Sequence, residues 1–178
     1  GELENSPVLA KRLASLADLF INDAFSVSHR VQASVVGVAK FLPAYAGLAL
    51  ERELKHLAIL SKPINPLVLI IGGVKFSTKL PLLRKFLPKA EFICVGGALA
   101  NTLLSARGIA VGASLTEKLT PSLIKLAKSP KIILPIDVIV QVGRKTELKN
   151  INYLGAEDKI VEIGPMTVKL FAAELIDT

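Results

Sequence analysis

Tryptophan is absent from the sequence, and cysteine, methionine and tyrosine are rare, with one, one and two residues respectively. A single cysteine offers no intrachain disulfide, and Cys94 lies in an apolar run, which predicts a small buried side chain in a reducing compartment. No apolar stretch reaches the roughly eighteen residues of a membrane-spanning helix, and no signal peptide is recognisable. We therefore expect a cytoplasmic protein that binds no membrane.

Long basic runs are also missing, although the net charge is +7. Lysine and arginine occur one or two at a time, and few aromatic side chains are available to stack on bases, which argues against a nucleic-acid partner. Residues 1–62 contain seven basic and six acidic residues, whereas residues 63–178 contain fifteen and nine. The positive excess of the second part fits small phosphate compounds better.

Two common nucleotide-binding loops are absent. The sequence has neither the Walker A pattern Gly-x-x-x-x-Gly-Lys-Ser/Thr nor the dinucleotide fingerprint Gly-x-Gly-x-x-Gly. Its His, Cys and carboxylate residues show no metal-ligand spacing, so we expect no metal site built by the protein alone. A P-loop enzyme and a Rossmann oxidoreductase are therefore disfavoured.

Short apolar runs and amphipathic stretches alternate after residue 63. They predict strands at 67–71, 91–95, 131–134 and 138–142 and helices at 77–87, 98–107, 120–128 and beyond Pro165. The unbroken apolar run 66–71 is typical of a strand covered on both faces, and the polar segment 143–160 predicts turns. We expect an α/β fold with a parallel sheet and helices on both faces, a Rossmann-like three-layer arrangement.

The first part of the sequence predicts two helices and a strand. Ser6-Pro7 is a helix-start signal, with a capping side chain and a proline in the first turn. The run 19–21 predicts a buried strand, and the periodic stretch 47–62 predicts a long helix that Pro63 and Pro66 end. His56 lies among the polar residues of that helix, so we expect it to be exposed.

The nine residues 72–80, Gly-Gly-Val-Lys-Phe-Ser-Thr-Lys-Leu, join a predicted strand to a predicted helix. Gly72 and Gly73 let the backbone turn sharply and approach a ligand closely. The helix start favours an anion, and Lys75 and Lys79, four residues apart, can point toward it. Many α/β domains contain such a junction without a ligand, so spacing alone leaves a phosphate site and a plain turn equally open.

The same nine residues resemble the nucleotide-side lysine motif of phosphoglycerate kinase. Four further strings occur in that family's order, at 22–34 (Asn-Asp-Ala-Phe, His-Arg, Ala-Ser), 37–43 (Gly-Val-Ala-Lys-Phe-Leu-Pro), 95–102 (Val-Gly-Gly-Ala-Leu-Ala-Asn-Thr) and 134–167 (Leu-Pro-Ile-Asp-Val, then Ile-Gly-Pro-Met-Thr). The resemblance runs through essentially the whole chain, but it covers only the middle of a family member.

The resemblance implies transfer of the acyl phosphate of 1,3-bisphosphoglycerate to ADP, giving 3-phosphoglycerate and ATP, by a two-lobed enzyme. In this interpretation residues 1–44 end the substrate-side domain, 45–63 form the interdomain helix and 64–178 begin the nucleotide-binding domain. Lys75 resembles the lysine that stabilises the phosphoryl group in flight, and Lys79 the lysine that holds the nucleotide phosphates. Any Mg²⁺ would arrive with ADP or ATP, and the full-length protein would be a monomer.

Gly96-Gly97 resembles the start of the family's adenine-side Gly-Gly-Gly, where a planar base lies on the backbone. Ala98 replaces the third glycine, which predicts a narrower pocket, and close packing of a helix on a strand would explain the glycines equally well. Leu115 and Val161 are candidates for the apolar wall of that pocket, and both also fit a place in the core.

His29-Arg30 resembles the dipeptide on the substrate side of the cleft. The planar fork of Arg30 suits a carboxylate or phosphate, and His29 fits an orienting role or a plain surface position. Asn22-Asp23 are interpreted as capping the following turn in preference to contacting a ligand, and Asp137 as structural. Glu162 could cap a helix start or contact water bound to the nucleotide, and a structural role is favoured. Glu162 stands where the family usually has aspartate.

Several family strings are missing. The sequence lacks the early Asp-x-Asn, Ser-His-Leu-Gly-Arg-Pro and Arg-Phe strings of the substrate patch and the late Trp-Asn-Gly-Pro and Gly-Gly-Gly-Asp strings. It also begins with glycine rather than methionine. We therefore expect an internal portion of a phosphoglycerate kinase that is not catalytically competent alone. A non-catalytic adenine-nucleotide-binding module and a structural fragment that needs complementation remain alternatives.

Overall fold

The structure is a computed structural model that describes residues 1–176, apart from the side chain of Phe76. The chain divides into two compact units, Gly1–Pro63 and Ile64–Thr178, and each is described by itself. Within the described residues, none of the helices combines the length and the apolar character needed to cross a membrane.

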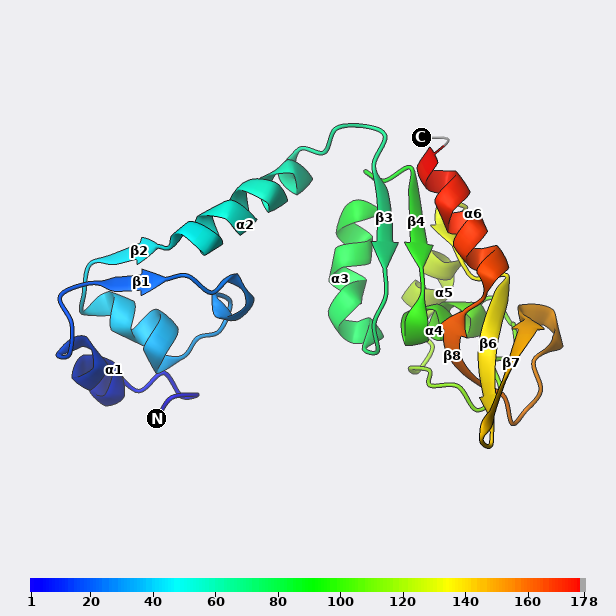
Figure 1. Cartoon of the computed structure of the whole chain (residues 1–178), viewed down its shortest axis with the longest axis horizontal. Coiled ribbons are helices and arrows are strands. Elements are labelled where there is room, and N and C mark those ends of the chain that lie inside the picture. The colour runs from blue at the N-terminus through cyan, green and yellow to red at the C-terminus, as the bar shows by residue number, and fades with distance from the viewer. Residues whose placement is uncertain (177–178) are drawn as a thin grey trace. The chain divides into compact units, whose positions relative to one another are not determined.

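The first unit contains two α-helices and a small parallel sheet (Figure 1). Its elements are α1 (Pro7–Ala14), β1 (Phe20–Asn22), η1 (Phe25–Val27), η2 (Ala33–Gly37), η3 (Val38–Lys40), β2 (Ala44–Ala46), α2 (Leu48–Ala58) and η4 (Ile59–Ser61). The predicted helix 47–62 is confirmed as α2 followed by η4, and His56 is exposed as expected. The expectation of a buried strand at 19–21 was wrong, because Ile21 of β1 is 55% exposed.

Both residues of the Asn22-Asp23 pair cap a backbone turn. The Asn22 side-chain oxygen accepts a hydrogen bond from the backbone N–H of Ala24 at 3.1 Å, as the sequence suggested. Asp23 acts farther away, because its Oδ1 accepts from the backbone N–H groups of Ala49 and Leu50, at 2.7 and 3.0 Å, at the start of α2. The predicted helix start after Ser6 is confirmed, but the Ser6 side chain makes no capping bond.

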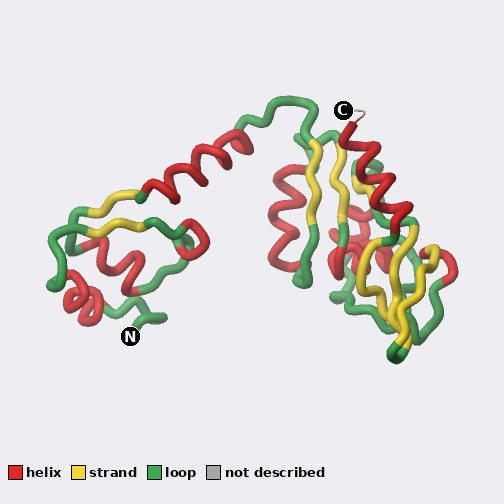
Figure 2. The backbone as a smooth tube through the Cα atoms, viewed as in Figure 1, coloured by secondary structure: helices red, strands yellow, loops and turns green. Residues whose placement is uncertain are grey.

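The second unit joins two three-stranded sheets with four α-helices among its described residues (Figure 2). Its elements are β3 (Val68–Ile71), α3 (Phe76–Phe86), β4 (Phe92–Val95), α4 (Gly97–Ala106), α5 (Pro121–Ala127), β5 (Ile132–Ile133), β6 (Asp137–Val142), β7 (Lys145–Asn150), η5 (Ile151–Tyr153), β8 (Lys159–Ile163) and α6 (Pro165–Ile176). The predicted parallel pairing is confirmed for β3, β4 and β5, and helices lie on both faces of that sheet. The run 138–142, expected in the same parallel sheet, instead forms β6 at the centre of a separate antiparallel sheet.

One face of the parallel sheet forms the core. Leu69 and Ile71 of β3 and Ile93 and Val95 of β4 point to that face and pack with apolar residues of α3, α4 and α5. Leu103 in the middle of α4 is completely buried there. Because strand side chains alternate between faces, the residues between them point to the opposite side.

The opposite face is only partly covered in the described residues. Cys94 is fully buried, and burial together with the nearby Glu174 of α6 raises the pKa of the Cys94 thiol to about 11. Ile70 pairs with Cys94 across the sheet but is 61% exposed. The prediction that the run 66–71 is covered on both faces was therefore wrong for the described residues, because the cover over Cys94 does not extend to Ile70 on the outer strand β3.

The segment 143–160 is not the turn-like region that its polarity predicted. After the turn at Gly143, which has a φ of +60°, β7 returns antiparallel to β6. The residues of β7 are mostly exposed, so an apolar alternation is missing from the sequence. β8 then pairs with the other edge of β6, also antiparallel.

Asp137 anchors the start of α6. Its carboxylate accepts hydrogen bonds from the backbone N–H groups of Met166 at 3.0 Å and Thr167 at 2.7 Å, and it lies 2.6 Å from the Thr167 hydroxyl. Asp137 is 3% exposed, and a side chain at Gly164 would collide with it. The structural role expected of Asp137 is confirmed. The cap at the start of α6, which was considered for Glu162, is provided by Asp137 instead.

The replacement Asp137→Ala is expected to lower the free energy of unfolding by about 2 kcal/mol, because the start of α6 loses its cap and the Thr167 hydroxyl loses a partner. Urea denaturation at neutral pH measures this loss. Glu157→Gln, which removes an exposed carboxylate of the same unit, should leave stability almost unchanged.

The same carboxylate gives a pH dependence. Burial alone would raise the pKa of Asp137, but the hydrogen bonds from Thr167 and from the backbone of Met166 and Thr167 outweigh it, and the pKa is lowered. The stabilisation is therefore complete above the ordinary aspartate pKa of about 3.9 and is lost as the pH falls through the lowered value. Asp137→Ala should consequently destabilise less at acidic pH than at neutral pH, and an equal effect would contradict this assignment.

Candidate functional site

Two glycine turns meet where β3 and β4 end. The backbone N–H of Gly96 donates to the Ile71 carbonyl at 2.9 Å, and that of Leu99 donates to the Gly73 carbonyl at 3.0 Å. Gly97 has a φ of +63°, and a methyl group placed on it would lie 3.3 Å from the Gly73 nitrogen. The structure therefore brings together the two glycine pairs that the sequence placed at neighbouring strand ends.

The predicted lysines flank the start of α3. Lys75 is exposed and occupies the N-cap position, where no side chain of its own turn caps the helix. Lys79 is half-buried, and its Cε would lie 3.6 Å from a methyl group placed on Gly73. The end of the Lys79 side chain therefore lies close to the first glycine turn.

A carboxylate that the sequence analysis missed also lies at this helix start. The Ser77 backbone N–H lies 3.2 Å and 3.4 Å from the two carboxylate oxygens of Glu117. The two residues are 40 positions apart, and Glu117 belongs to a loop without periodicity. No sequence signal pairs them, because the contact arises from the fold of the intervening helix and strand.

The loop 112–119 is held in place by two buried side chains of α4. The Asn101 amide donates to the Leu115 carbonyl at 3.4 Å, and the Thr102 hydroxyl accepts from the backbone N–H of Glu117 at 3.1 Å. Asn101 and Thr102 are 3% and 1% exposed. Both residues belong to the family string 95–102, which suggests no role for them, and the structure shows that they position this loop.

The two residues predicted for the apolar wall, Leu115 and Val161, are both exposed. Leu115 is 55% exposed and Val161 is 48% exposed, so neither belongs to the core. The backbone N–H of Ile160 donates to the Ser114 hydroxyl at 2.8 Å, which holds the loop beside β8. Val161 lies near the second glycine turn, since it lines the same small cavity as Gly97 and Ala98.

A small cavity lies beneath that surface. Its volume is about 30 Å³, and it is lined by Gly97, Ala98, Asn101, Val138, Val161 and Ile163, among others. This space accommodates a water molecule but not a purine. A base bound here would therefore lie on the outer side of Gly96 and Gly97.

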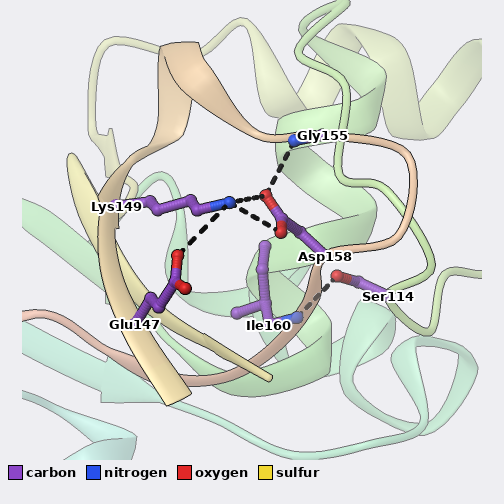
Figure 3. Close-up of polar contacts among 6 residues, drawn as sticks. All are labelled: Ser114, Glu147, Lys149, Gly155, Asp158 and Ile160. Atoms are coloured by element: carbon purple, nitrogen blue, oxygen red, sulfur yellow. Dashed lines mark hydrogen bonds and ion pairs between the residues drawn. The ribbon is translucent and has the colours of Figure 1, made fainter. Parts of the chain in front are cut away.

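An ion pair secures the segment that leads into β8 (Figure 3). The Lys149 Nζ atom of β7 lies 2.8 and 2.9 Å from the two carboxylate oxygens of Asp158. It also lies 3.8 Å from Oε2 of Glu147. The second oxygen of Asp158 also accepts from the backbone N–H of Gly155 at 2.7 Å. The hydrogen bond from Lys149 and that from Gly155 lower the pKa of Asp158, and the bond to Asp158 raises the pKa of Lys149.

The predicted substrate residues belong to the first unit. His29 and Arg30 are both exposed and follow η1. The backbone N–H of Arg30 donates to the Val27 carbonyl at 2.9 Å. The Asn22 side-chain amide, which donates to the Ser28 hydroxyl at 3.1 Å, further supports this turn.

Among residues 1–176, no group of three or more His, Cys, Asp or Glu side chains is arranged to hold a metal ion. The edge of the parallel sheet brings together two lysines, a helix start and two glycine turns, all of which are groups that favour an anion.

Known proteins resemble the chain over its whole length. A family model described as phosphoglycerate kinase matches residues 1–178. The curated phosphoglycerate kinases of Sphingopyxis alaskensis and Maricaulis maris are 39% and 41% identical, over 97% and 94% of this chain and 46% and 44% of their own lengths. The chain thus spans about half the length of these relatives.

Solved structures agree with this similarity. The phosphoglycerate kinase structure from Coxiella burnetii is 38% identical, with a TM-score of 0.75 over 100% of this chain and 49% of that one. The structure from Pyrococcus horikoshii OT3 reaches a TM-score of 0.82 at 23% identity, covering 94% of this chain and 45% of its own, and supports the fold alone.

The contact between the glycine turns predicts that Gly97→Ala lowers the free energy of unfolding of the second unit by more than the backbone strain of a positive φ accounts for. Gly143→Ala is the matched control, because Gly143 has a φ of +60° and nothing lies within 4 Å of an added methyl group. Each replacement should cost about 1 kcal/mol for the backbone, and Gly97→Ala should cost more because its methyl group meets Gly73. Equal losses in urea denaturation would show that the turns separate freely.

The ion pair of Figure 3 predicts that Lys149→Met lowers the urea midpoint at neutral pH, whereas Lys145→Met, on the exposed part of the same strand, leaves it unchanged. The Asp158 contribution should be present above the ordinary aspartate pKa and vanish as the pH falls through its lowered value. The Lys149 contribution should be present below the ordinary lysine pKa and vanish as the pH rises through its raised value. A midpoint unaffected by Lys149→Met would contradict the assignment.

Proposed function

Because the chain belongs to the phosphoglycerate kinase family, we propose that it forms the nucleotide-phosphate site and part of the substrate site for phosphoryl transfer between 1,3-bisphosphoglycerate and ADP. The observation that supports this most directly is the meeting of two glycine turns beside Lys75 and Lys79 at the start of α3. Family membership supports the reaction, and the geometry supports these residues as the ones that bind the phosphates.

Phosphoryl transfer requires alignment and positive charge more than covalent help from the protein. Lys79, whose side chain ends close to Gly73, is proposed to bind the phosphates of the nucleotide. Lys75, at the N-cap of α3, is proposed to stabilise the negative charge on the oxygens of the group in transfer. Gly72 and Gly73 would allow those phosphates to approach the backbone closely.

The adenine base is proposed to lie on Gly96 and Gly97, between the exposed side chains of Leu115 and Val161. A planar ring can contact the backbone at these glycines because no Cβ atom intervenes. The aliphatic side chains would supply apolar contact on either side. The hydrogen bond between Ile160 and Ser114 keeps these two walls adjacent.

On the substrate side, Arg30 is proposed to bind the carboxylate or phosphate of 3-phosphoglycerate or 1,3-bisphosphoglycerate through its planar fork. His29 is proposed to orient that end of the substrate. Both side chains are exposed and therefore accessible to a ligand.

Mg²⁺ is proposed to arrive with ADP or ATP, bound mainly by phosphate oxygens, because the described residues contain no cluster that forms a cage of its own. The ion would neutralise phosphate charge. We further propose that the full-length protein is a cytoplasmic monomer without nucleic-acid or membrane partners, a proposal supported by its family and its scattered basic residues.

A second candidate function is nucleotide binding without catalysis. It is favoured by one observation, namely that both glycine turns and both lysines belong to the second unit, whereas His29 and Arg30 belong to the first. Such a module would bind ADP but not 3-phosphoglycerate. A structural fragment that needs complementation would bind neither.

Calorimetric titration of MgADP, and separately of 3-phosphoglycerate, into the 178-residue chain distinguishes these possibilities. We expect saturable ADP binding that Lys79→Ala abolishes or weakens at least tenfold, since a phosphate contact is lost. Lys85→Ala, an exposed lysine in the last turn of the same helix, is the control and should bind ADP normally.

Turnover is tested in a chimera that adds the remaining sequence of the Maricaulis maris relative. Coupled ATP formation should be present and should fall about 100-fold or more in Lys75→Ala, because transition-state charge loses its partner. A chimera that folds and binds both ligands, yet shows no turnover or no effect of Lys75→Ala, would refute the kinase assignment.

A further inference from the structure

A carboxylate lies at the helix start beside the two lysines that are proposed to act on the phosphates. The Ser77 backbone N–H, in the first turn of α3, is within 3.2 Å of one Glu117 oxygen and 3.4 Å of the other. Carboxylate and phosphate oxygens accept hydrogen bonds from a helix start for the same reason, since both are anions facing the positive end of the helix dipole. The two groups therefore cannot use this donor simultaneously.

The carboxylate contact is not required to hold the loop. The Glu117 backbone N–H is bound by the buried Thr102 hydroxyl, and the Leu115 carbonyl accepts from the buried Asn101 amide. Farther back, the Ala113 backbone N–H donates to the Asp158 carbonyl at 2.9 Å. These bonds therefore hold the main chain of the loop independently of the half-buried Glu117 carboxylate.

Local capping does not explain the contact either. Helices commonly take a cap from the residue that precedes them, but the N-cap of α3 is Lys75, whose side chain is not an acceptor. Thr78 does not supply the cap, since its hydroxyl donates to the Lys75 carbonyl at 2.9 Å. Glu117 is consequently the carboxylate that approaches the Ser77 N–H from outside the helix.

We propose that Glu117 is an intramolecular competitor for the nucleotide phosphates, an inference that rests on the proposed function of this site. Without nucleotide, its carboxylate accepts from Ser77 and satisfies the helix start. When ADP binds, a phosphate takes over this donor and the Glu117 side chain turns outward. Glu117 thereby lowers the affinity for phosphate groups and favours their release, while Asn101 and Thr102 keep the loop positioned in both states.

The test measures binding of pyrophosphate, ADP and adenosine to the 178-residue chain and to Glu117→Gln by calorimetry, without Mg²⁺. Glutamine keeps the length of the side chain but removes the competing charge. We expect pyrophosphate and ADP to bind about threefold to tenfold more tightly to Glu117→Gln, in keeping with one charge at a helix start. Adenosine, which has no phosphate, should bind equally to both proteins.

Glu91→Gln is the matched control, because Glu91 is exposed and precedes β4, at the end of the strand opposite the glycine turns. It removes the same charge and should leave pyrophosphate affinity unchanged. The Ser77 amide resonance in ¹⁵N–¹H spectra provides a second readout. It should shift in free Glu117→Gln, and on adding pyrophosphate the wild-type and variant resonances should converge.

Other results would overturn the inference. If Glu117→Gln binds pyrophosphate as weakly as the wild-type chain, or more weakly, Glu117 is a purely structural cap. If neither the wild-type chain nor Glu117→Gln binds pyrophosphate, Glu117 does not compete for a phosphate site. If Glu117→Gln weakens ADP only when Mg²⁺ is added, Glu117 is a metal ligand instead. None of these results decides the kinase assignment, which depends on turnover of the chimera and its loss in Lys75→Ala.

Discussion

The close approach of two glycine turns is the constraint on which the candidate site depends. Gly73 and Gly97 leave only 3.3 Å between the Gly73 nitrogen and a hypothetical Cβ on Gly97, so a side chain there would push the ends of β3 and β4 apart. The hydrogen bond from Leu99 to Gly73 directs the start of α4 along the same edge. Two helix starts thus face one small area of backbone, which is a favourable environment for a phosphorylated ligand.

Polar side chains around this area position the loop that completes it. Asn101 and Thr102 are buried in α4, where an unpaired polar group would be costly, and each bonds to the main chain of the loop 112–119. Asp158 restrains the other side of the same loop and is itself held by Lys149. The loop 112–119 is therefore positioned by hydrogen bonds as well as by the apolar packing of Val111 and Ile160 against the core.

Both units use an aspartate at a strand boundary to cap a distant helix. Asp23, directly after β1, caps α2, and Asp137, at the start of β6, caps α6. In each case a glycine just before the helix lies against the carboxylate, and an added side chain would collide with it. Helix positioning thus explains the aspartates of these family strings without a role in ligand binding.

The sequence by itself determined the helices, the parallel strands β3, β4 and β5, and the glycine and lysine positions, because local periodicity and turn residues encode them. It did not reveal the antiparallel strand β7, whose exposed residues show no apolar pattern, or the exposure of Ile70 on an edge strand. Only the tertiary structure placed Glu117 against Ser77, since a contact between segments 40 residues apart depends on how the elements pack and leaves no periodic trace in the chain.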